Sequence, residues 1–174
     1  MKYKYEDNLQ TQRLTTRFLT LNDIELWSKF FDDEECVKFF PTFGHTTSNG
    51  RATHWIDKQL NRYKDNRYGL QALIDKETGE FIGQCGLLAQ DVDGITEVEV
   101  GYHIFKPHWG KGYATEAAQL FKKYAFDNEQ CKSLVSIIHV DNILSQKVAE
   151  RNGMKRDKRI KFFDEDHYVY RIFQ

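Results

Sequence analysis

The spacing of hydrophobic residues changes along the chain, and these changes divide it into three parts. In the first part apolar side chains recur every three or four residues, which predicts helices around 24–31 and over 47–67. A strand-like run at 14–21 precedes them, and a short helical turn occupies 32–41 between them. The chain therefore begins as a strand followed by helices.

The middle of the chain has the two-residue period of β-strands. We predict three strands, over 68–75, 80–90 and 95–105. The dipeptides Thr78-Gly79 and Asp93-Gly94 lie between them and are typical of tight hairpin turns. The three strands should therefore form an antiparallel meander.

The last part alternates between the two periods. It predicts a helix over 112–126, a buried strand over 134–140, a helix over 143–152 and a closing hairpin of strands 155–163 and 167–173. Asn152-Gly153 suits a left-handed end to the second helix. The whole order predicts an α/β fold in a single domain spanning 1–174, with a twisted, mixed, mostly antiparallel sheet of six or seven strands flanked by about four helices.

Composition narrows the class of protein. The chain has 174 residues, of which 40% are hydrophobic and 14% aromatic, enough for one packed core. A net charge of −1 gives no electrostatic reason to expect nucleic acid or an anionic membrane as a partner. The three cysteines are far apart, which fits reduced thiols in a cytoplasmic protein, and neither they nor the six histidines show the spacing of metal ligands, so we expect no metal. No apolar run is long enough to span a bilayer, and the N-terminus lacks the apolar region of a signal peptide.

The most specific chemical signal is the glycine-bearing turn Trp109-Gly110-Lys111-Gly112-Tyr113-Ala114-Thr115, between a predicted strand and a predicted helix. Such a turn brings several backbone N–H groups together at the positive end of a helix dipole, which favours a phosphate or pyrophosphate. A helix that merely begins at a glycine is the alternative. Lys111 is followed by glycine rather than Ser or Thr, which excludes a Walker P-loop, and the preceding meander disfavours a dinucleotide-binding fingerprint.

The strand at 97–104 and the turn together resemble the GCN5-related N-acetyltransferase (GNAT) family. The family's pyrophosphate motif, Q/R-x-x-G-x-G/A, maps onto Trp109, Gly112 and Ala114. Tryptophan departs from the usual Gln or Arg, although W-G-K-G-Y-A is frequent in the branch of ribosomal-protein N-terminal acetyltransferases (RimJ/RimL-like). The opening Q-R-L-T-T-R, from residue 12, also looks like the start of this branch.

A second family element lies toward the C-terminus. The pattern N-x-x-S before a helix that closes on N-G-M is present as Asn142, Ser145 and Asn152-Gly153-Met154. Together the motifs cover roughly the whole chain. The resemblance therefore implies the GNAT fold and an N-acetyltransferase that uses acetyl-CoA as co-substrate.

The resemblance also implies which residues hold the co-substrate. The pantetheine arm would pair with the backbone of the strand before the turn, and the pyrophosphate would lie on the amides of 110–115. The full predicted set of cofactor-binding residues is Tyr102, His103, Ile104, Trp109, Gly110, Lys111, Gly112, Tyr113, Ala114, Thr115, Asn142 and Ser145. Asn142 and Ser145 have an alternative role as helix caps.

An amine must be neutral to attack the thioester. An amine with a pKa of about 10.4 costs roughly 4.6 kcal/mol to deprotonate at pH 7, whereas an α-amine near 7.8 costs only about 1 kcal/mol. We predict Glu99 as the catalytic base, because some family members carry a catalytic Glu at this place. Glu97 is the weaker candidate on the same face, and His139 is an alternative that would act through water. Each residue also has an alternative without a catalytic role. The carboxylates would then be solvated groups on a strand, and His139 would be a hydrogen-bonded histidine of the core.

The leaving thiolate needs a proton or a hydrogen bond. Many family members supply it from a Tyr seven residues after the Asn, but that position is Ala149 here. We predict Ser145 as the replacement acid. Val140 also replaces the proline that usually precedes D-N in the family.

Several readings of function stay open. A protein N-terminus is the first expectation for the acceptor, followed by a small amine such as a polyamine or amino sugar, in a monomer or a homodimer. The absence of the usual Tyr at Ala149 favours an alternative, a non-catalytic acyl-CoA-binding sensor or partner-binding module on the same fold. A nucleotide-binding protein that uses the glycine turn is a third reading.

Overall fold

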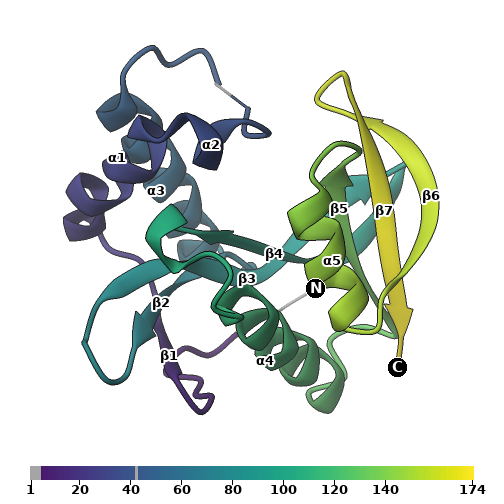
Figure 1. Cartoon of the computed structure of the whole chain (residues 1–174). Helices are drawn as coiled ribbons and strands as arrows, with labels where there is room; N and C mark the ends of the chain where they lie inside the picture. The colour runs from purple at the N-terminus through teal and green to yellow at the C-terminus, as the bar shows by residue number, and fades with distance from the viewer. Residues whose placement is uncertain (1–4, 42) are drawn as a thin grey trace.

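The computed structural model describes residues 5–41 and 43–174 and contains one seven-stranded sheet (Figure 1). Its strands are β1 (Leu14–Arg17), β2 (Leu70–Asp75), β3 (Phe81–Val92), β4 (Ile95–Ile104), β5 (Ser133–His139), β6 (Lys155–Phe162) and β7 (Glu165–Phe173). They are ordered β1-β2-β3-β4-β5-β7-β6. Every neighbouring pair is antiparallel except β4 and β5, which are parallel. The predicted mixed, mostly antiparallel sheet is therefore confirmed.

Five α-helices pack on this sheet. They are α1 (Ile24–Asp32), α2 (Glu34–Val37), α3 (Ser48–Lys64), α4 (Tyr113–Asp127) and α5 (Ile143–Arg151), with short 3-10 turns η1 (Leu21–Asp23) and η2 (Lys106–His108). Figure 1 shows α1, α2 and α3 gathered at the upper left, with α4 and α5 in front of the sheet. Among the described residues, no helix is both long and apolar enough to cross a membrane.

Alternation along the strands gives the sheet two buried faces. On one face, Trp27, Phe30, Ala52 and Ile56 of α1 and α3 pack in a cluster that includes Leu88 of β3. On the other face, α4 and α5 contribute to a larger cluster that contains residues of β3, β4 and β5. We call these the α3 face and the α4/α5 face. Each side chain of β4 points to one of the two, so consecutive residues of this strand serve different faces.

The parallel pair β4 and β5 is joined at only one register position, Glu99 opposite Val135. Beyond it, β4 stays paired with β3 as far as Ile104, and β5 stays paired with β7 as far as His139. The sheet therefore forks between β4 and β5. We call this opening the β4–β5 fork.

Most element boundaries differ from the predicted ones by a few residues. The helix predicted to reach residue 67 ends at Lys64, because Asn66 takes a left-handed conformation (φ 54°). The first strand ends at Arg17 instead of 21, where the Arg17 guanidinium pairs with Asp23 at 2.7 Å. The closing hairpin turns at Phe163 and Asp164, both at positive φ, and not at a glycine.

Candidate active site

The glycine turn directly follows β4 and η2, as the sequence predicts. Gly110 (φ 74°) and Gly112 (φ 83°) both have left-handed backbones, a conformation that favours glycine. Gly112 is the N-cap residue of α4. A Cβ on Gly110 would meet nothing within 4 Å, and one on Gly112 would meet only Arg13 Nη2 at 3.5 Å. The outer side of the turn is therefore open.

The backbone N–H groups of residues 110–115 have no hydrogen-bond acceptor anywhere in the described chain. The first helical hydrogen bond runs from Glu116 N–H to Gly112 O at 3.0 Å, so the donors before it are left over. The first N–H groups of any helix lack a partner within the helix. The turn before α4, which contains Gly110 and Gly112, adds further unpaired N–H groups. The turn thus presents a group of donors with the positive end of α4 behind them.

Two contacts fix the turn against the rest of the molecule. Arg13, just before β1, donates from Nη1 to Lys111 O at 2.9 Å and pairs through Nη2 with Glu116 at 2.6 Å. Burial alone would raise the pKa of Glu116, but hydrogen bonds from Thr11 and Arg13 hold that pKa below its usual value. The carboxylate therefore stays charged, and α4 stays attached to β1.

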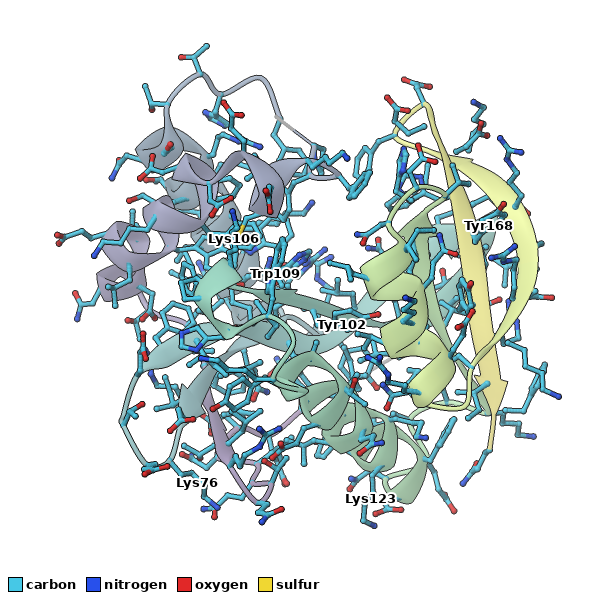
Figure 2. All side chains as sticks on the ribbon, viewed as in Figure 1. Lys76, Tyr102, Lys106, Trp109, Lys123 and Tyr168 are labelled. Atoms are coloured by element: carbon cyan, nitrogen blue, oxygen red, sulfur yellow. The ribbon has the colours of Figure 1, made fainter. Side chains whose placement is uncertain are left out.

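On its other side the turn is tied to the β2–β3 hairpin. Tyr113 Oη donates to Asp75 Oδ2 at 2.7 Å, and this hydrogen bond, followed by one from Thr78, lowers the pKa of Asp75 to about 2. Trp109 Nε1 donates to Ile104 O at 2.7 Å, which holds the start of the turn against the end of β4. Figure 2 shows Trp109 close to the end of β4, beside Lys106. Lys111, Ala114 and Thr115 lie within or directly after the turn.

At the β4–β5 fork, a side chain from each strand binds the backbone of the other. Ser136 Oγ donates to Val100 O at 2.8 Å, and Ile137 N–H donates to Glu99 Oε1 at 3.1 Å. Gln90 Nε2 donates to the other carboxylate oxygen of Glu99 at 2.8 Å. If β4 and β5 stayed paired, the Val100 carbonyl and the Ile137 N–H would form hydrogen bonds within the sheet. Here side chains form these hydrogen bonds instead, and they hold β4 and β5 together at the point where the strands separate.

Glu99 is the buried carboxylate of this region, with 7% of its surface exposed. Burial raises its pKa above the usual value, and the hydrogen bonds from Gln90 and Ile137 oppose the shift without cancelling it. A carboxylate with a raised pKa accepts a proton more readily than an exposed one. Glu97, two residues earlier, is instead held by Arg171 at 2.7 Å, in an ion pair between two mostly buried side chains.

Tyr102 and Ser145 meet on the α4/α5 face. Ser145 Oγ donates to Tyr102 Oη at 3.0 Å, and Tyr102 Oη donates to the Ser145 carbonyl at 2.9 Å. Burial raises the pKa of Tyr102 above its usual value. In Figure 2, Tyr102 lies near the centre of the view, between β4 and α5. Asn142, not Ser145, caps α5, because its Oδ1 accepts from Ser145 N–H at 3.1 Å.

His139 lies at the end of β5, away from Glu99. It is four residues beyond Val135, the register partner of Glu99, which is about 13 Å along a strand. Its ring stacks on Phe39 at 4.7 Å and packs edge-on against His167 at 5.3 Å. The structure therefore does not bring the two candidate bases into contact.

His103, predicted as a backbone contact for the cofactor, carries its ring on the α3 face. Burial lowers its pKa to about 4, so the ring is neutral near pH 7. The predicted candidates thus divide between the two faces. Glu99, His103 and His139 lie on the α3 face, whereas Tyr102, Ile104 and the glycine turn belong to the α4/α5 side, and the fork lies between them.

Several residues that shape this region were given no role by the sequence patterns. Arg13, Asp75 and Ser136 are of this kind, since their partners are distant in sequence. Arg13 belongs to the opening motif, which was the one signal that pointed to it. Among the described residues, no group of three or more His, Cys, Asp or Glu side chains is arranged to hold a metal ion.

The turn with its unpaired amides lies beside the forked sheet, and comparison with known proteins identifies the class of protein. Residues 13–155 match the sequence family described as the acetyltransferase (GNAT) domain. The chain belongs to this family and is an acetyltransferase. It is 32% identical over 165 residues to the uncharacterized protein YkkB of Bacillus subtilis (strain 168), with 93% of each chain covered. It is 28% identical over 156 residues to the uncharacterized N-acetyltransferase p20 of Bacillus licheniformis, covering 87% of this chain and 86% of p20.

Solved structures share the fold. An acetyltransferase from Agrobacterium tumefaciens str. C58 is 28% identical, with a TM-score of 0.81 over 99% of this chain and 97% of that one. Mycobacterium smegmatis RimJ, solved in complex with CoA-disulfide, has a TM-score of 0.76 over 92% of this chain and 81% of its own. Its identity is 18%, so this likeness concerns the fold alone. The predicted GNAT fold is confirmed.

Proposed function

We propose that the protein transfers an acetyl group from acetyl-CoA to a primary amine by direct attack. The observation that carries this proposal is the group of unpaired N–H donors at 110–115 beside the β4–β5 fork. A diphosphate needs several donors at a helix N-terminus, and an extended pantetheine arm needs a strand with an open edge. Family membership and the CoA complex of RimJ support the same co-substrate.

The predicted cofactor contacts fit this arrangement. Gly110 to Thr115 would receive the pyrophosphate, and the backbone of Tyr102, His103 and Ile104 would face the pantetheine arm. Trp109 would brace the turn. Asn142, which caps α5, would present its amide beside Ser145 at the inner end of the fork.

In the transfer, the amine nitrogen bonds to the acetyl carbon, the C–S bond breaks and the nitrogen loses a proton. We assign the proton to Glu99, through water, because its buried carboxylate has a raised pKa and lies at the base of the fork. His139 is the second candidate. Backbone N–H groups of β4 would stabilise the carbonyl oxygen as it becomes negative.

Ser145 would stabilise the leaving sulfur as a hydrogen-bond donor. A free thiol has a pKa of about 8.5, whereas a tyrosine hydroxyl is near 10 and a serine hydroxyl is a still weaker acid, so full proton transfer from this pair is uphill. When the Ser145 hydroxyl turns toward the sulfur, Tyr102 can donate to Ser145 Oγ in exchange. The pair thus takes the place of the tyrosine that Ala149 replaces.

We infer a protein N-terminus as the first acceptor and a small amine or polyamine as the second. The resemblance of the glycine-turn motif to the RimJ/RimL-like branch supports the first, and so does the lower cost of deprotonating an α-amine. The test is release of free CoA thiol from acetyl-CoA with a panel of peptides and amines. Thiol release that depends on the amine is expected. Tight acetyl-CoA binding with no turnover on any amine would contradict the enzyme and favour the sensor alternative.

A further inference from the structure

Two carboxylates lie two residues apart on β4, on the same face of the sheet, but they have different kinds of partner. Glu97 is held by the Arg171 guanidinium, whose Nη1 and Nη2 donate to its two oxygens at 3.0 and 2.7 Å. Among the described residues Glu99 forms no ion pair, and its oxygens accept from the Ile137 N–H and from Gln90 Nε2. One carboxylate is therefore bound by a cation and the other by neutral amides.

Strand register brings Gln90 to both carboxylates. Gln90 of β3 lies directly opposite Glu97 and diagonally across from Glu99. Arg171 occupies both oxygens of Glu97 and is itself held by Asp157 at 2.8 Å. The Gln90 amide bonds the diagonal carboxylate at 2.8 Å, a distance that long side chains span across an antiparallel pair.

The charged groups that face Glu99 come from α3, β4 and β7. Glu97 and Arg171 are paired with each other, whereas Arg62 of α3 acts on Glu99 through its charge. Burial has the largest effect on the pKa of Glu99 and raises it. The hydrogen bond from Gln90 is the largest of the opposing effects, ahead of the charge of Arg62. Gln90 is therefore the side chain that most favours the ionised form of Glu99.

We propose that Gln90 is a positioning residue for the candidate base Glu99. This inference rests on the proposed N-acetyltransferase function and on the role of Glu99 in it. The Gln90 amide fixes one carboxylate oxygen, and that oxygen keeps a second lone pair for the water or amine that delivers the proton. Because the amide is neutral, it orients the carboxylate without the charge that would weaken it as a base.

A neutral partner suits a general base. A base is most effective when its pKa lies near the working pH, and an adjacent cation lowers the pKa of a carboxylate away from that range. Glu97 shows the other arrangement on the same strand, a carboxylate fixed by two hydrogen bonds from one guanidinium. The partner, amide or guanidinium, thus separates the candidate catalytic carboxylate from the structural one.

The first test changes the donor in two directions. Gln90→Met keeps the length of the side chain but removes the hydrogen bond, which should raise the pKa of Glu99, whereas Gln90→Lys supplies a charged donor, which should lower it. The kcat/KM is measured by thiol release from pH 5 to 9, with the most active amine of the panel, and corrected to the neutral amine. We expect its acid limb to move up by about one pH unit in Gln90→Met and down by about one in Gln90→Lys.

A purely structural role would not move the limb in opposite directions. An acid limb that stays in place, or that moves the same way in both variants, would overturn the proposal. The pKa of Glu99 is also measured directly, by ¹³C NMR of the glutamate carboxyl groups, with the signal identified by its loss in Glu99→Gln. Should Gln90→Lys fail to fold, Gln90→Met and this titration decide the outcome.

The second test asks whether Gln90 acts through Glu99. Below the acid limb, Gln90→Met alone should lower kcat/KM about tenfold, the effect of a shift of one pH unit. In the Glu99→Gln background the same change should have no further effect, because the carboxylate that it acts on is gone. A tenfold loss in both backgrounds would show that Gln90 acts elsewhere and would contradict the proposal.

Gln71→Met is the matched control. Gln71 is a buried glutamine of β2 that points to the α4/α5 face, where its Nε2 donates to Glu6 O at 2.8 Å. Its variant should keep the wild-type pH profile. Turnover with an unmoved acid limb would contradict the role of Gln90 alone, whereas acetyl-CoA binding without turnover on any amine would contradict the proposed function as well.

Discussion

At the scale of single residues, the two groups assigned to proton and hydrogen-bond chemistry lie on opposite faces of β4. Glu99 points to the α3 face, and Tyr102 points to the α4/α5 face, where it holds Ser145. The attacking amine and the leaving sulfur are different substituents of the tetrahedral intermediate, so the proton acceptor and the hydrogen-bond donor must be separate groups. Placing a base on one face and a hydroxyl on the other therefore suits one thioester lying in the fork.

Replacing Glu99 by Gln should change the pH dependence of the rate. The base works only when deprotonated, so wild-type kcat/KM should rise as pH increases through the raised pKa of Glu99. In Glu99→Gln this rise is lost, and the rate should follow the ionisation of the acceptor amine at higher pH. The deficit should therefore shrink toward the alkaline end of a series from pH 5.5 to 9.5, where the acceptor amine becomes neutral without a base. Superimposable profiles would point to His139 or water as the base.

Replacing Ser145 by Ala should lower kcat about 10- to 100-fold, because it removes a donor to the leaving sulfur. The affinity for acetyl-CoA should change much less, since Asn142 and the glycine turn remain. Ser28→Ala is a suitable control, because the Ser28 hydroxyl is exposed and bonds only Glu25 O, at 2.7 Å. A wild-type kcat in Ser145→Ala would remove this residue from the mechanism.

At the scale of elements, the N-terminus of α4 is where we propose that the co-substrate binds. Two left-handed glycines precede it, and contacts to β1 and to the β2–β3 hairpin hold it. These contacts hold the turn in one conformation, and preorganised donors bind more tightly than mobile ones.

A bulky side chain at the turn should block the co-substrate. Gly112→Trp places an indole among the donors, and we expect acetyl-CoA affinity to fall at least about 100-fold in calorimetry. A left-handed non-glycine residue costs only about 1–2 kcal/mol, so the fold should persist. Gly94→Trp imposes the same strain at a distant hairpin (φ 80°) and should bind normally. Unchanged affinity in Gly112→Trp would refute the assigned turn.

The elements themselves could be predicted from hydrophobic period and turn residues, but their partners could not. The hairpin at Phe163 and Asp164 lacks the glycine that marks such turns, so its position was predicted only approximately. The pair of Arg13 and Glu116 joins residues 103 positions apart, and the contact between Gln90 and Glu99 depends on strand register. Period reveals which face a residue occupies, whereas cross-strand neighbours follow from three-dimensional packing.

At the scale of the whole molecule, the β4–β5 fork lies between the α4/α5 side and the α3 side, to which we assign different roles. The α4/α5 side carries the glycine turn and the hydroxyl groups of Tyr102 and Ser145. The α3 side carries Glu99, the candidate base, and the aromatic rings around His103. Figure 1 shows β4 running from one half to the other. A thioester that enters along β4 would reach both.

Binding of acetyl-CoA should stabilise the whole fold. A ligand at 100 times its Kd adds about 2.7 kcal/mol to the free energy of unfolding. For a chain of this size, each 1 kcal/mol raises Tm by roughly 2–4 °C, so a shift of about 5–11 °C is expected in thermal unfolding. ATP and NAD at the same concentration should give little shift. A larger shift with either nucleotide would contradict the acyl-CoA reading.

We propose above all that the amides of residues 110–115 bind the diphosphate of acetyl-CoA beside the β4–β5 fork. The most direct test is titration of the ¹⁵N-labelled protein with CoA, followed by NMR of the backbone amides. We expect the largest shifts at 110–115 and at 101–104. Saturable binding that leaves these amides unmoved and shifts others would contradict it.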